Sequence, residues 1–288
     1  MMFVSCGPTL YQTHARLAAA PVAPGNHAAS STRVDVDGAA ANMARTVTAL
    51  GHEATFITMI GDGPIANLCR SILLEDDVDV HDVAGVGEPP LSAVITGPGG
   101  EAIHASGLED GRESDYPAPS VLDGASALLI DGALPHLQLP LARQAKQNGL
   151  PIITHLERHT PDTEAMIALS THVIVSPRFS FPDLAGADPA TLVSAIYHRG
   201  PAFVARSSGA DPIVVAFEDK AYSIDIPDLP PGDIADTIGA GHVLTAGFAV
   251  SMADGTHPLE AVGAGAQVAT VSLKYEGANG WARSFQER

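Results

Sequence analysis

The residues best suited to chemistry lie in one run near the C-terminus, Asp236-Thr237-Ile238-Gly239-Ala240-Gly241-His242-Val243-Leu244-Thr245. The run leads into an apolar segment that predicts a helix over about 239–253. The first N–H groups of a helix have no intrahelical acceptor, and the helix dipole adds positive charge there. Gly239 and Gly241 carry no side chain, so a ligand can approach their backbone closely. The run therefore predicts a seat for an anion such as a phosphate.

Predicted strands and helices, which must position this run, alternate along the chain. Strand patterns cover 3–7, 54–60, 127–130, 151–154, 173–176, 202–205 and 213–217, and helix patterns cover 39–50, 65–74, 140–148, 163–170, 190–198, 239–253 and 258–275. Strands that alternate with helices are typical of a mostly parallel sheet with helices on both faces. We therefore expect an α/β protein with a three-layer α/β/α architecture, folded as a single domain over residues 1–288.

One stretch interrupts this alternation. Two strand-like segments at 91–96 and 101–105 flank Gly97-Pro98-Gly99-Gly100, a pattern that predicts a hairpin with a glycine-rich turn. Either this hairpin is a plain surface feature or it covers a binding site. We favour a cover, placed at about 91–106 as an insertion in the domain, because the hairpin breaks an otherwise regular βα pattern.

Two histidines in the middle of the chain raise the question of a metal site. His155 and His159 are four residues apart, with Glu157 between them. They follow a predicted strand and precede Pro161, so a helix that would bring both rings to one face is not expected. Metal binding needs more converging ligands than two histidines on a loop. We therefore predict no metal site and expect these side chains to face solvent or pack in a loop.

Composition excludes several classes of protein. The net charge is −18 and the chain has only three lysines, which argues against nucleic acid and anionic membranes as partners. The N-terminus shows no signal-peptide pattern, so a cytoplasmic location is expected. The chain contains neither the glycine-lysine phosphate loop nor the Gly-x-Ser-x-Gly nucleophile motif, and no Gly-x-Gly-x-x-Gly follows the first strand.

The C-terminal run resembles the signature of the ribokinase-like carbohydrate kinases, the phosphofructokinase-B family. That signature reads Asp-Thr-x-Gly-Ala-Gly-Asp, and Asp236, Thr237, Gly239, Ala240 and Gly241 match it in register. The last Asp, which is the family's catalytic base, is His242 here. By this resemblance Gly239, Ala240 and Gly241 would bind the transferring phosphate, His242 would occupy the base position, and Asp236 and Thr237 would support the nucleotide.

A second stretch, Asp37-Gly38-Ala39-Ala40-Ala41-Asn42-Met43-Ala44, is similar to the family's Gly-Gly-x-x-x-Asn-x-Ala. The resemblance implies that Gly38 and Asn42 touch the substrate; otherwise Asn42 is a helix-start residue that caps its own backbone. The stretch 205–211 is similar to the nucleotide-side loop of the ketohexokinase-like branch, which would place Ser207, Ser208 and Gly209 near ATP. Without the resemblance, it predicts an ordinary turn between two strands.

The chain also departs from the family at several positions, most of them acidic in the family. Asp37 replaces a glycine, Gly63 stands where the family often has Asp, and His155 stands where the family's strand ends in Asp. The magnesium-linked Asn-x-x-Glu element is missing from 176–180, which reads Ser-Pro-Arg-Phe-Ser. Since carboxylate ligands are scarce, Mg²⁺ would contact the phosphates largely through water.

Three hypotheses for His242 follow. It is an altered but working base, it marks an inactive relative that only binds ligands, or it indicates a different reaction on the same scaffold. A neutral imidazole can accept a proton near pH 7, although it is bulkier than a carboxylate and becomes a cation. We place the working base first, the binding protein second and the different reaction last.

The resemblance implies a ribokinase-like fold with a small β-sheet lid at about 91–106, joined by a segment near 11–21. It implies ATP-dependent phosphorylation of a sugar or sugar-like alcohol, with ATP and Mg²⁺ as cofactors. The alternative is a pseudokinase that binds a sugar or a nucleotide as a sensor or partner subunit. An exposed lid edge would also suit a homodimer.

Overall fold

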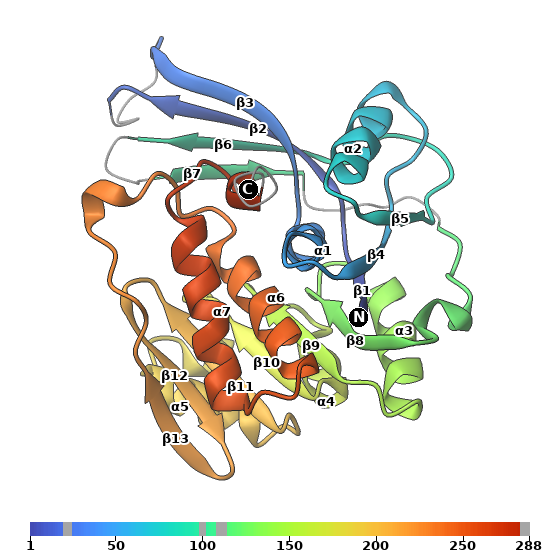
Figure 1. The fold of residues 1–288 in the computed structure, drawn as a ribbon, viewed down its shortest axis with the longest axis vertical. Helices are drawn as coiled ribbons and strands as arrows, with labels where there is room; N and C mark the ends of the chain where they lie inside the picture. Colours follow the sequence, from blue (N-terminus) through green and yellow to red (C-terminus); the bar gives the residue numbers. More distant parts are fainter. Residues whose placement is uncertain (20–24, 98–101, 108–113, 283–288) are drawn as a thin grey trace.

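A large, mostly parallel sheet forms the centre of the molecule (Figure 1). The computed structural model describes residues 1–19, 25–97, 102–107 and 114–282, and in this part of the chain the sheet has nine strands. Their order is β13 (Lys220–Ile224), β12 (Asp211–Phe217), β11 (Phe203–Ser208), β10 (His172–Val175), β9 (Ile152–Leu156), β8 (Ala125–Ile130), β1 (Met2–Cys6), β4 (Glu53–Thr58) and β5 (Asp79–Asp82). Neighbours are parallel from β5 through β11, whereas β12 and β13 are antiparallel additions at one edge.

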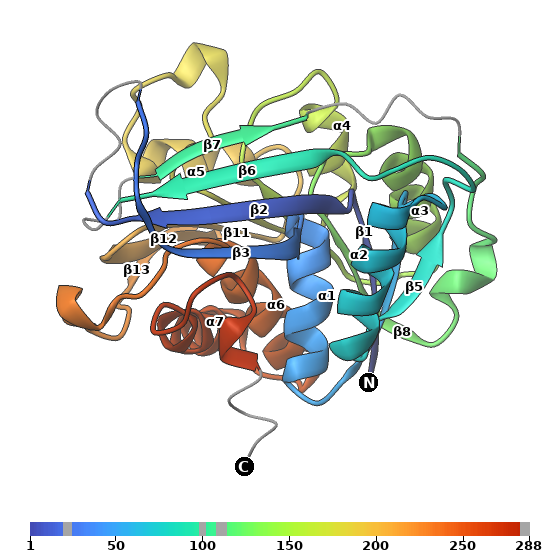
Figure 2. The same cartoon turned by 90° about the horizontal axis from the view of Figure 1, so that it is seen from above.

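Helices cover both faces of this sheet, as the alternating pattern predicted (Figure 2). One face carries α1 (Ala39–Ala49), α2 (Pro64–Glu75), α6 (Ala240–Ala253) and α7 (Pro258–Ser272); the other carries α3 (Pro135–Gln147), α4 (Thr163–Leu169) and α5 (Pro189–Tyr197). Successive strand residues point to opposite faces, so Phe3 packs in the core under α1 and α6 while Val4 packs in the core under α3. No described helix is long and apolar enough to span a membrane.

A second, smaller sheet lies beside the first (Figures 1 and 2). It consists of β3 (Ala29–Asp37), β2 (Leu10–Leu17), β6 (Leu91–Thr96) and β7 (Ala102–Ser106), in that order. The pairs β2–β3 and β6–β7 are antiparallel, and β2–β6 is parallel. The predicted hairpin is therefore present as β6 and β7, with its turn at 98–101 outside the described residues. The sequence predicted that a segment near residues 11–21 joins the small sheet, and β2 begins there. It did not predict the long strand β3.

One difference from the predicted elements matters for the site. The strand predicted over 151–154 runs to Leu156, so His155 is a strand residue with only 1% of its surface exposed. The prediction that His155 faces solvent or packs in a loop was wrong. Its backbone pairs with β10 in parallel register, opposite Ile174, and its ring lies against Thr245 and His242 of α6. A strand that is buried on both faces shows no alternation, so its end is hard to locate from the sequence.

Candidate active site

A cavity of about 490 Å³ opens where the carboxyl ends of the parallel strands meet the start of α6. Its lining joins elements that are far apart in the sequence: Asp37 from β3, His104 from β7, His155 from β9, Ser207 from β11 and Thr237 from the loop before α6. Ligands of parallel α/β sheets bind at this end of the strands. The small sheet contributes to the wall, so β3 and β7 cover part of the cavity, as expected of a lid.

The start of α6 forms one wall of the cavity. Gly239 precedes the helix in the left-handed conformation, with φ of 74°, and a Cβ at this position would overlap the side chain of Ala278. The N–H groups of His242 and Val243 both point to the Gly239 carbonyl, at 2.9 and 3.0 Å. Thr237, Gly239, Ala240 and Gly241 all line the cavity. The start of α6, where the sequence predicts an anion seat, therefore lies at the cavity.

Asp236 does not line the cavity; its carboxylate instead stabilises the turn before α6 through hydrogen bonds. Its Oδ1 accepts a hydrogen bond from the Ile238 N–H at 2.9 Å, and its Oδ2 accepts one from the Gly277 N–H at 2.9 Å. The same Oδ2 forms an ion pair with Arg33 of β3 at 3.2 Å. Both oxygens of this carboxylate therefore contact other residues of the protein, and these contacts join the start of α6 to the small sheet.

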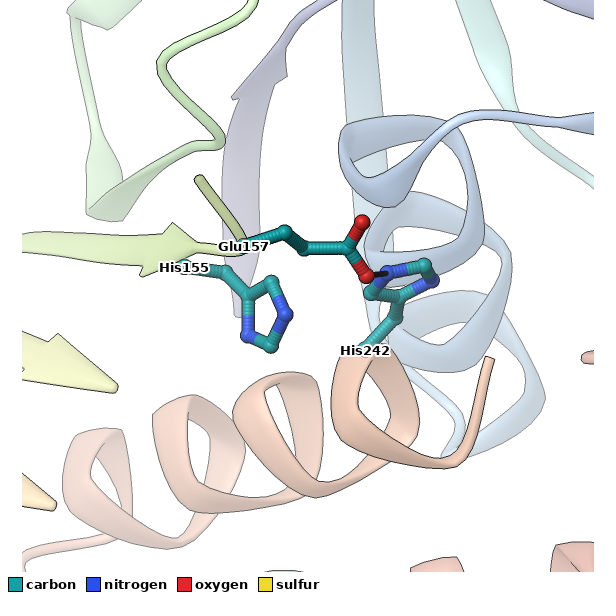
Figure 3. A group of neighbouring side chains, drawn as sticks. All are labelled: His155, Glu157 and His242. Carbon is teal, nitrogen blue, oxygen red and sulfur yellow. Dashed lines mark hydrogen bonds and ion pairs between the residues drawn. The ribbon is translucent and has the colours of Figure 1, made fainter. Parts of the chain in front are cut away.

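His242 lies in the first turn of α6, and both of its ring nitrogens contact side chains. Asn42 donates from Nδ2 to the Asp37 carboxylate at 2.7 Å, and the same Nδ2 faces His242 Nδ1 at 3.1 Å. A carboxylate only accepts, so the Asn42 NH₂ must point this way, and His242 Nδ1 must accept from it. In the neutral ring the proton is then on Nε2, which donates to Glu157 Oε1 at 3.3 Å (Figure 3).

Glu157 follows β9 and supplies a carboxylate directly beside His242. Burial alone lowers the pKa of His242, but the hydrogen bond and charge of Glu157, together with the charges of Asp37 and Asp131, outweigh burial and raise it. The pKa of Glu157 is lowered well below its usual range: burial raises it, but the hydrogen bond and charge of His242 act more strongly together. Glu157 Oε1 also accepts from Arg178 at 3.0 Å. Its other oxygen, Oε2, has no hydrogen bond to a described residue.

His155 lies on the other side of His242, with its ring perpendicular to that of His242 and the ring centroids 5.0 Å apart. Its Nδ1 contacts Thr245 Oγ1 at 2.9 Å, whereas its Nε2 is buried and has no partner among the described residues. Burial, reinforced by the neighbouring His242, lowers the pKa of His155 to about 3, so this ring is neutral. The neutral state agrees with an Nε2 that carries a free lone pair.

The structure brings together only part of the predicted site. Asn42 is fully buried and does not line the cavity, because its amide is used by Asp37, His242 and Asn279. Gly38 starts α1 at φ of 120° and is likewise outside the lining. Ser207 and Gly209 line the cavity, while the Ser208 hydroxyl accepts from Arg206 instead. The direct substrate contacts of Gly38 and Asn42 therefore remain predictions.

Sequence reasoning missed Asp37, Glu157 and Arg178 as cavity residues. Glu157 had a usable signal, since it comes directly after a strand whose end lies at the ligand edge of a parallel sheet. An apolar stretch of the wall was also missed; its members are Ile213, Ile226, Leu229, Ala269 and Leu273, from β12, the segment after β13, and α7. No single motif marks this wall, because three segments build it.

The same fold occurs in solved structures of low sequence identity. A provisionally named ribokinase from Agrobacterium tumefaciens superposes with a TM-score of 0.85 at 22% identity, over 99% of this chain and 96% of that one. Adenosine kinase from Sinorhizobium meliloti gives 0.79 at 15% identity, over 99% and 98% of the two chains. Ribokinase of Arabidopsis thaliana, complexed with ribose and ATP, gives 0.73 at 17%, over 99% and 97%. No curated protein sequence matches significantly.

These neighbours establish the ribokinase-like fold, with its large mostly parallel sheet and its smaller second sheet. The family is shown by a sequence model that describes pfkB family carbohydrate kinases and matches residues 9–283. The match spans the small sheet, every strand of the large sheet except β1, and the whole cavity lining described above. The chain therefore belongs to the pfkB family of carbohydrate kinases.

Proposed function

We propose that this protein transfers the γ-phosphoryl group of ATP to a hydroxyl of a sugar or sugar-like small molecule. The observation that carries the proposal is the start of α6, where Thr237 to Gly241 line the cavity with an open helix N-terminus. Phosphoryl transfer depends mainly on positioning and on neutralising the charge of the phosphate. Backbone N–H groups fixed before the reaction are suited to that role.

The rest of the lining supports a nucleotide next to this seat. The apolar wall formed by Ile213, Ile226, Leu229 and Leu273 suits a flat base, which would leave the phosphates at α6. Asp37, Glu157 and Asp228 are the carboxylates of the lining. Mg²⁺ is usually held by one or two carboxylates together with water and substrate phosphates, so this donor set fits it. When bound with ATP, Mg²⁺ would neutralise charge on the transferring group.

The proton of the acceptor hydroxyl needs a base, and we assign this role to Glu157 and His242 acting as a pair. His242 occupies the family's base position, but both of its nitrogens are engaged in the described conformation. Glu157 Oε2 lies beside it without a described partner, and Glu157 lines the cavity. The carboxylate that the family's Asp provides would thus come from the end of β9 instead of from α6.

A second candidate is a protein that binds nucleotide or sugar without turnover. The observation in its favour is the engagement of both His242 nitrogens, because a proton could enter Nδ1 only if the Asn42 amide turned away. In addition, the strongly lowered pKa of Glu157 makes this carboxylate a weak base.

Turnover assays separate the two candidates. ADP release and product mass would be followed with ATP, Mg²⁺ and a panel of ketoses, aldoses, nucleosides and sugar acids, using the native protein and His242→Asp. The exposed His159, changed to Asp, is a matched control for added charge near β9. Phosphorylated product from the native protein establishes the kinase. No product from native protein or His242→Asp, with nucleotide binding retained in both, would contradict the kinase and favour the binding protein.

A further inference from the structure

We propose that His155, Glu157 and His242 form a binding site for one divalent transition metal ion of the zinc class. The three side chains come from β9, from the residue that follows it and from α6, and they converge at the cavity (Figure 3). One ligand atom from each lies within 4.8 Å of the other two. The inference does not depend on kinase activity, since binding can be measured without substrate.

The hydrogen bonds of Thr245 prepare His155 as a ligand. The Thr245 hydroxyl donates to the Gly241 carbonyl at 2.8 Å, so towards His155 Nδ1, at 2.9 Å, it can only accept. His155 therefore carries its proton on Nδ1, and Nε2 keeps a lone pair. This Nε2 is fully buried and has no hydrogen-bond donor among the described residues. An outer partner that fixes the ring and leaves the other nitrogen free is typical of histidines that bind metals.

The spacing of the other two ligands already suits a tetrahedral ion. Metal–ligand bonds of about 2.0–2.1 Å place tetrahedral ligand atoms about 3.4 Å apart. The separation between His242 Nε2 and Glu157 Oε1 is 3.3 Å. The ion would take the place of the proton that these two atoms now share. The ligand atoms now lie within 4.8 Å of one another, so metal binding requires His155 and the Glu157–His242 pair to draw together by up to about 1.4 Å.

One neighbouring amide must adjust to this exchange. With metal on Nε2, His242 carries its proton on Nδ1, so Asn42 Nδ2 can no longer donate to that nitrogen. The Asn42 amide cannot simply turn over, because Asp37 accepts from the same Nδ2 at 2.7 Å and would then face an oxygen. Metal binding therefore requires Asn42 to move away from Nδ1 while it keeps its hydrogen bond to Asp37.

The donor set selects the class of ion. Two imidazoles and one carboxylate suit zinc and neighbouring transition metals, whereas Mg²⁺ prefers oxygen ligands. Three protein ligands also leave a fourth position open, and it faces the cavity because all three residues line it. A bound ion would engage both groups that we assign to proton transfer. The site shares Glu157 with the carboxylates that suit Mg²⁺, and its two imidazole ligands distinguish it from the Mg²⁺ that accompanies ATP.

Zinc binding to the metal-stripped, folded protein tests the proposal. In competition with a chromophoric chelator, we expect one Zn²⁺ per chain, and at least about 100-fold weaker binding by His155→Gln and by Glu157→Gln. His159→Gln is the matched control and should bind like the native protein. Thr245→Val, which removes the acceptor for His155 Nδ1 together with the hydroxyl's hydrogen bond to the Gly241 carbonyl, should weaken binding about 10- to 100-fold. Co²⁺ should give the intense visible absorption of a tetrahedral site in the native protein but not in His155→Gln.

Circular dichroism melting in chelator identifies variants that fail to fold. Glu157 is one-third exposed, so Glu157→Gln remains informative if the buried His155→Gln unfolds. The proposal is overturned if the native protein binds no stoichiometric Zn²⁺, if folded Glu157→Gln binds as tightly as native protein, or if millimolar Mg²⁺ displaces the Zn²⁺. Equal loss of binding in His159→Gln would also overturn it, because the ligands would then lie elsewhere.

Discussion

The start of α6 and the group of side chains around His242 meet at one cavity, but they follow the kinase pattern to different degrees. The phosphate seat keeps the family's small residues in register, from Thr237 to Gly241, with Gly239 in the left-handed conformation that the turn requires. The base position instead holds an imidazole next to a carboxylate from β9. Backbone donors tolerate little change in geometry, whereas a side-chain proton acceptor can be supplied from a neighbouring strand. The comparison indicates that the residues proposed to bind phosphate and those proposed to accept the proton can change independently of each other.

The largest expected effect comes from removing the carboxylate. With Mg²⁺ present and transition metals removed, Glu157→Gln should lower kcat by about 10²–10⁴-fold, which is the usual size of general-base catalysis. The KM for ATP should change little, because the phosphate seat is intact. Steady-state kinetics would measure this, with the exposed Glu164→Gln as the control, since Glu164 pairs with Arg199 away from the cavity. A full kcat in Glu157→Gln would mean that the carboxylate next to β9 does not take the role of the family's catalytic Asp.

His172 lies outside the cavity lining and shows how burial alone changes the pKa of a histidine. His172 packs against Phe203 and Phe248, and burial lowers its pKa to about 4. The unfolded chain binds the proton near pH 6.5, so this histidine favours unfolding as the pH falls from 6.5 towards 4. Stability from the neutral ring is complete above pH 6.5, and the loss reaches about 3 kcal/mol below pH 4.

His172→Gln tests whether this histidine destabilises the protein as the pH falls, because glutamine does not titrate. Urea unfolding at pH 7.5, 5.5 and 4 should show a smaller loss of stability in the variant than in the native protein. His198→Gln, near the end of α5, is a control that should keep the native slope. Equal slopes in native protein and His172→Gln would mean that the ring is not held neutral.

Alanine substitutions at Gly239 and Gly241, in the proposed phosphate seat, separate the effect of a strained backbone from the effect of a crowded side chain. In Gly239→Ala, a Cβ meets Ala278 and the φ of 74° is unfavourable, so we expect destabilisation of about 1–3 kcal/mol and roughly tenfold weaker ATP binding. Gly241→Ala, by contrast, would place its Cβ 3.1 Å from His155 Cε1. We expect it to weaken ATP binding less, because Gly241 needs no left-handed backbone and a small shift of the His155 ring relieves the contact. Calorimetric titration with ATP compares them; unchanged affinity in both would place the nucleotide elsewhere.

The sequence predicted the place of the start of α6 better than the surroundings of His242, for physical reasons. Glycines at a helix start leave a local pattern, and the positions of Gly239 and Gly241 follow from it. The hydrogen-bond partners of His242 are Asn42 and Glu157, and Asn42 in turn contacts Asp37 and Asn279; only the tertiary fold brings these residues together. His155 was misplaced because a doubly buried strand gives no alternation at its end. The edge strands β5 and β13 are short, and their burial pattern is weak, so they escaped prediction as well.

The smallest expected effect concerns the link between the two regions and the small sheet. Arg33 of β3 pairs with Asp236, whose carboxylate is almost fully buried and also accepts from the Gly277 and Ile238 N–H groups. Arg33→Gln removes the charge but leaves both backbone donors, so we expect a loss of about 1 kcal/mol rather than the larger cost of an unpaired buried ion. Arg16→Gln breaks the more exposed pair with Glu276 and should cost under about 0.5 kcal/mol. Denaturant unfolding measures both. A loss in Arg33→Gln no larger than in Arg16→Gln would show that the two backbone donors alone hold Asp236, and that the phosphate seat does not depend on the small sheet for its stability.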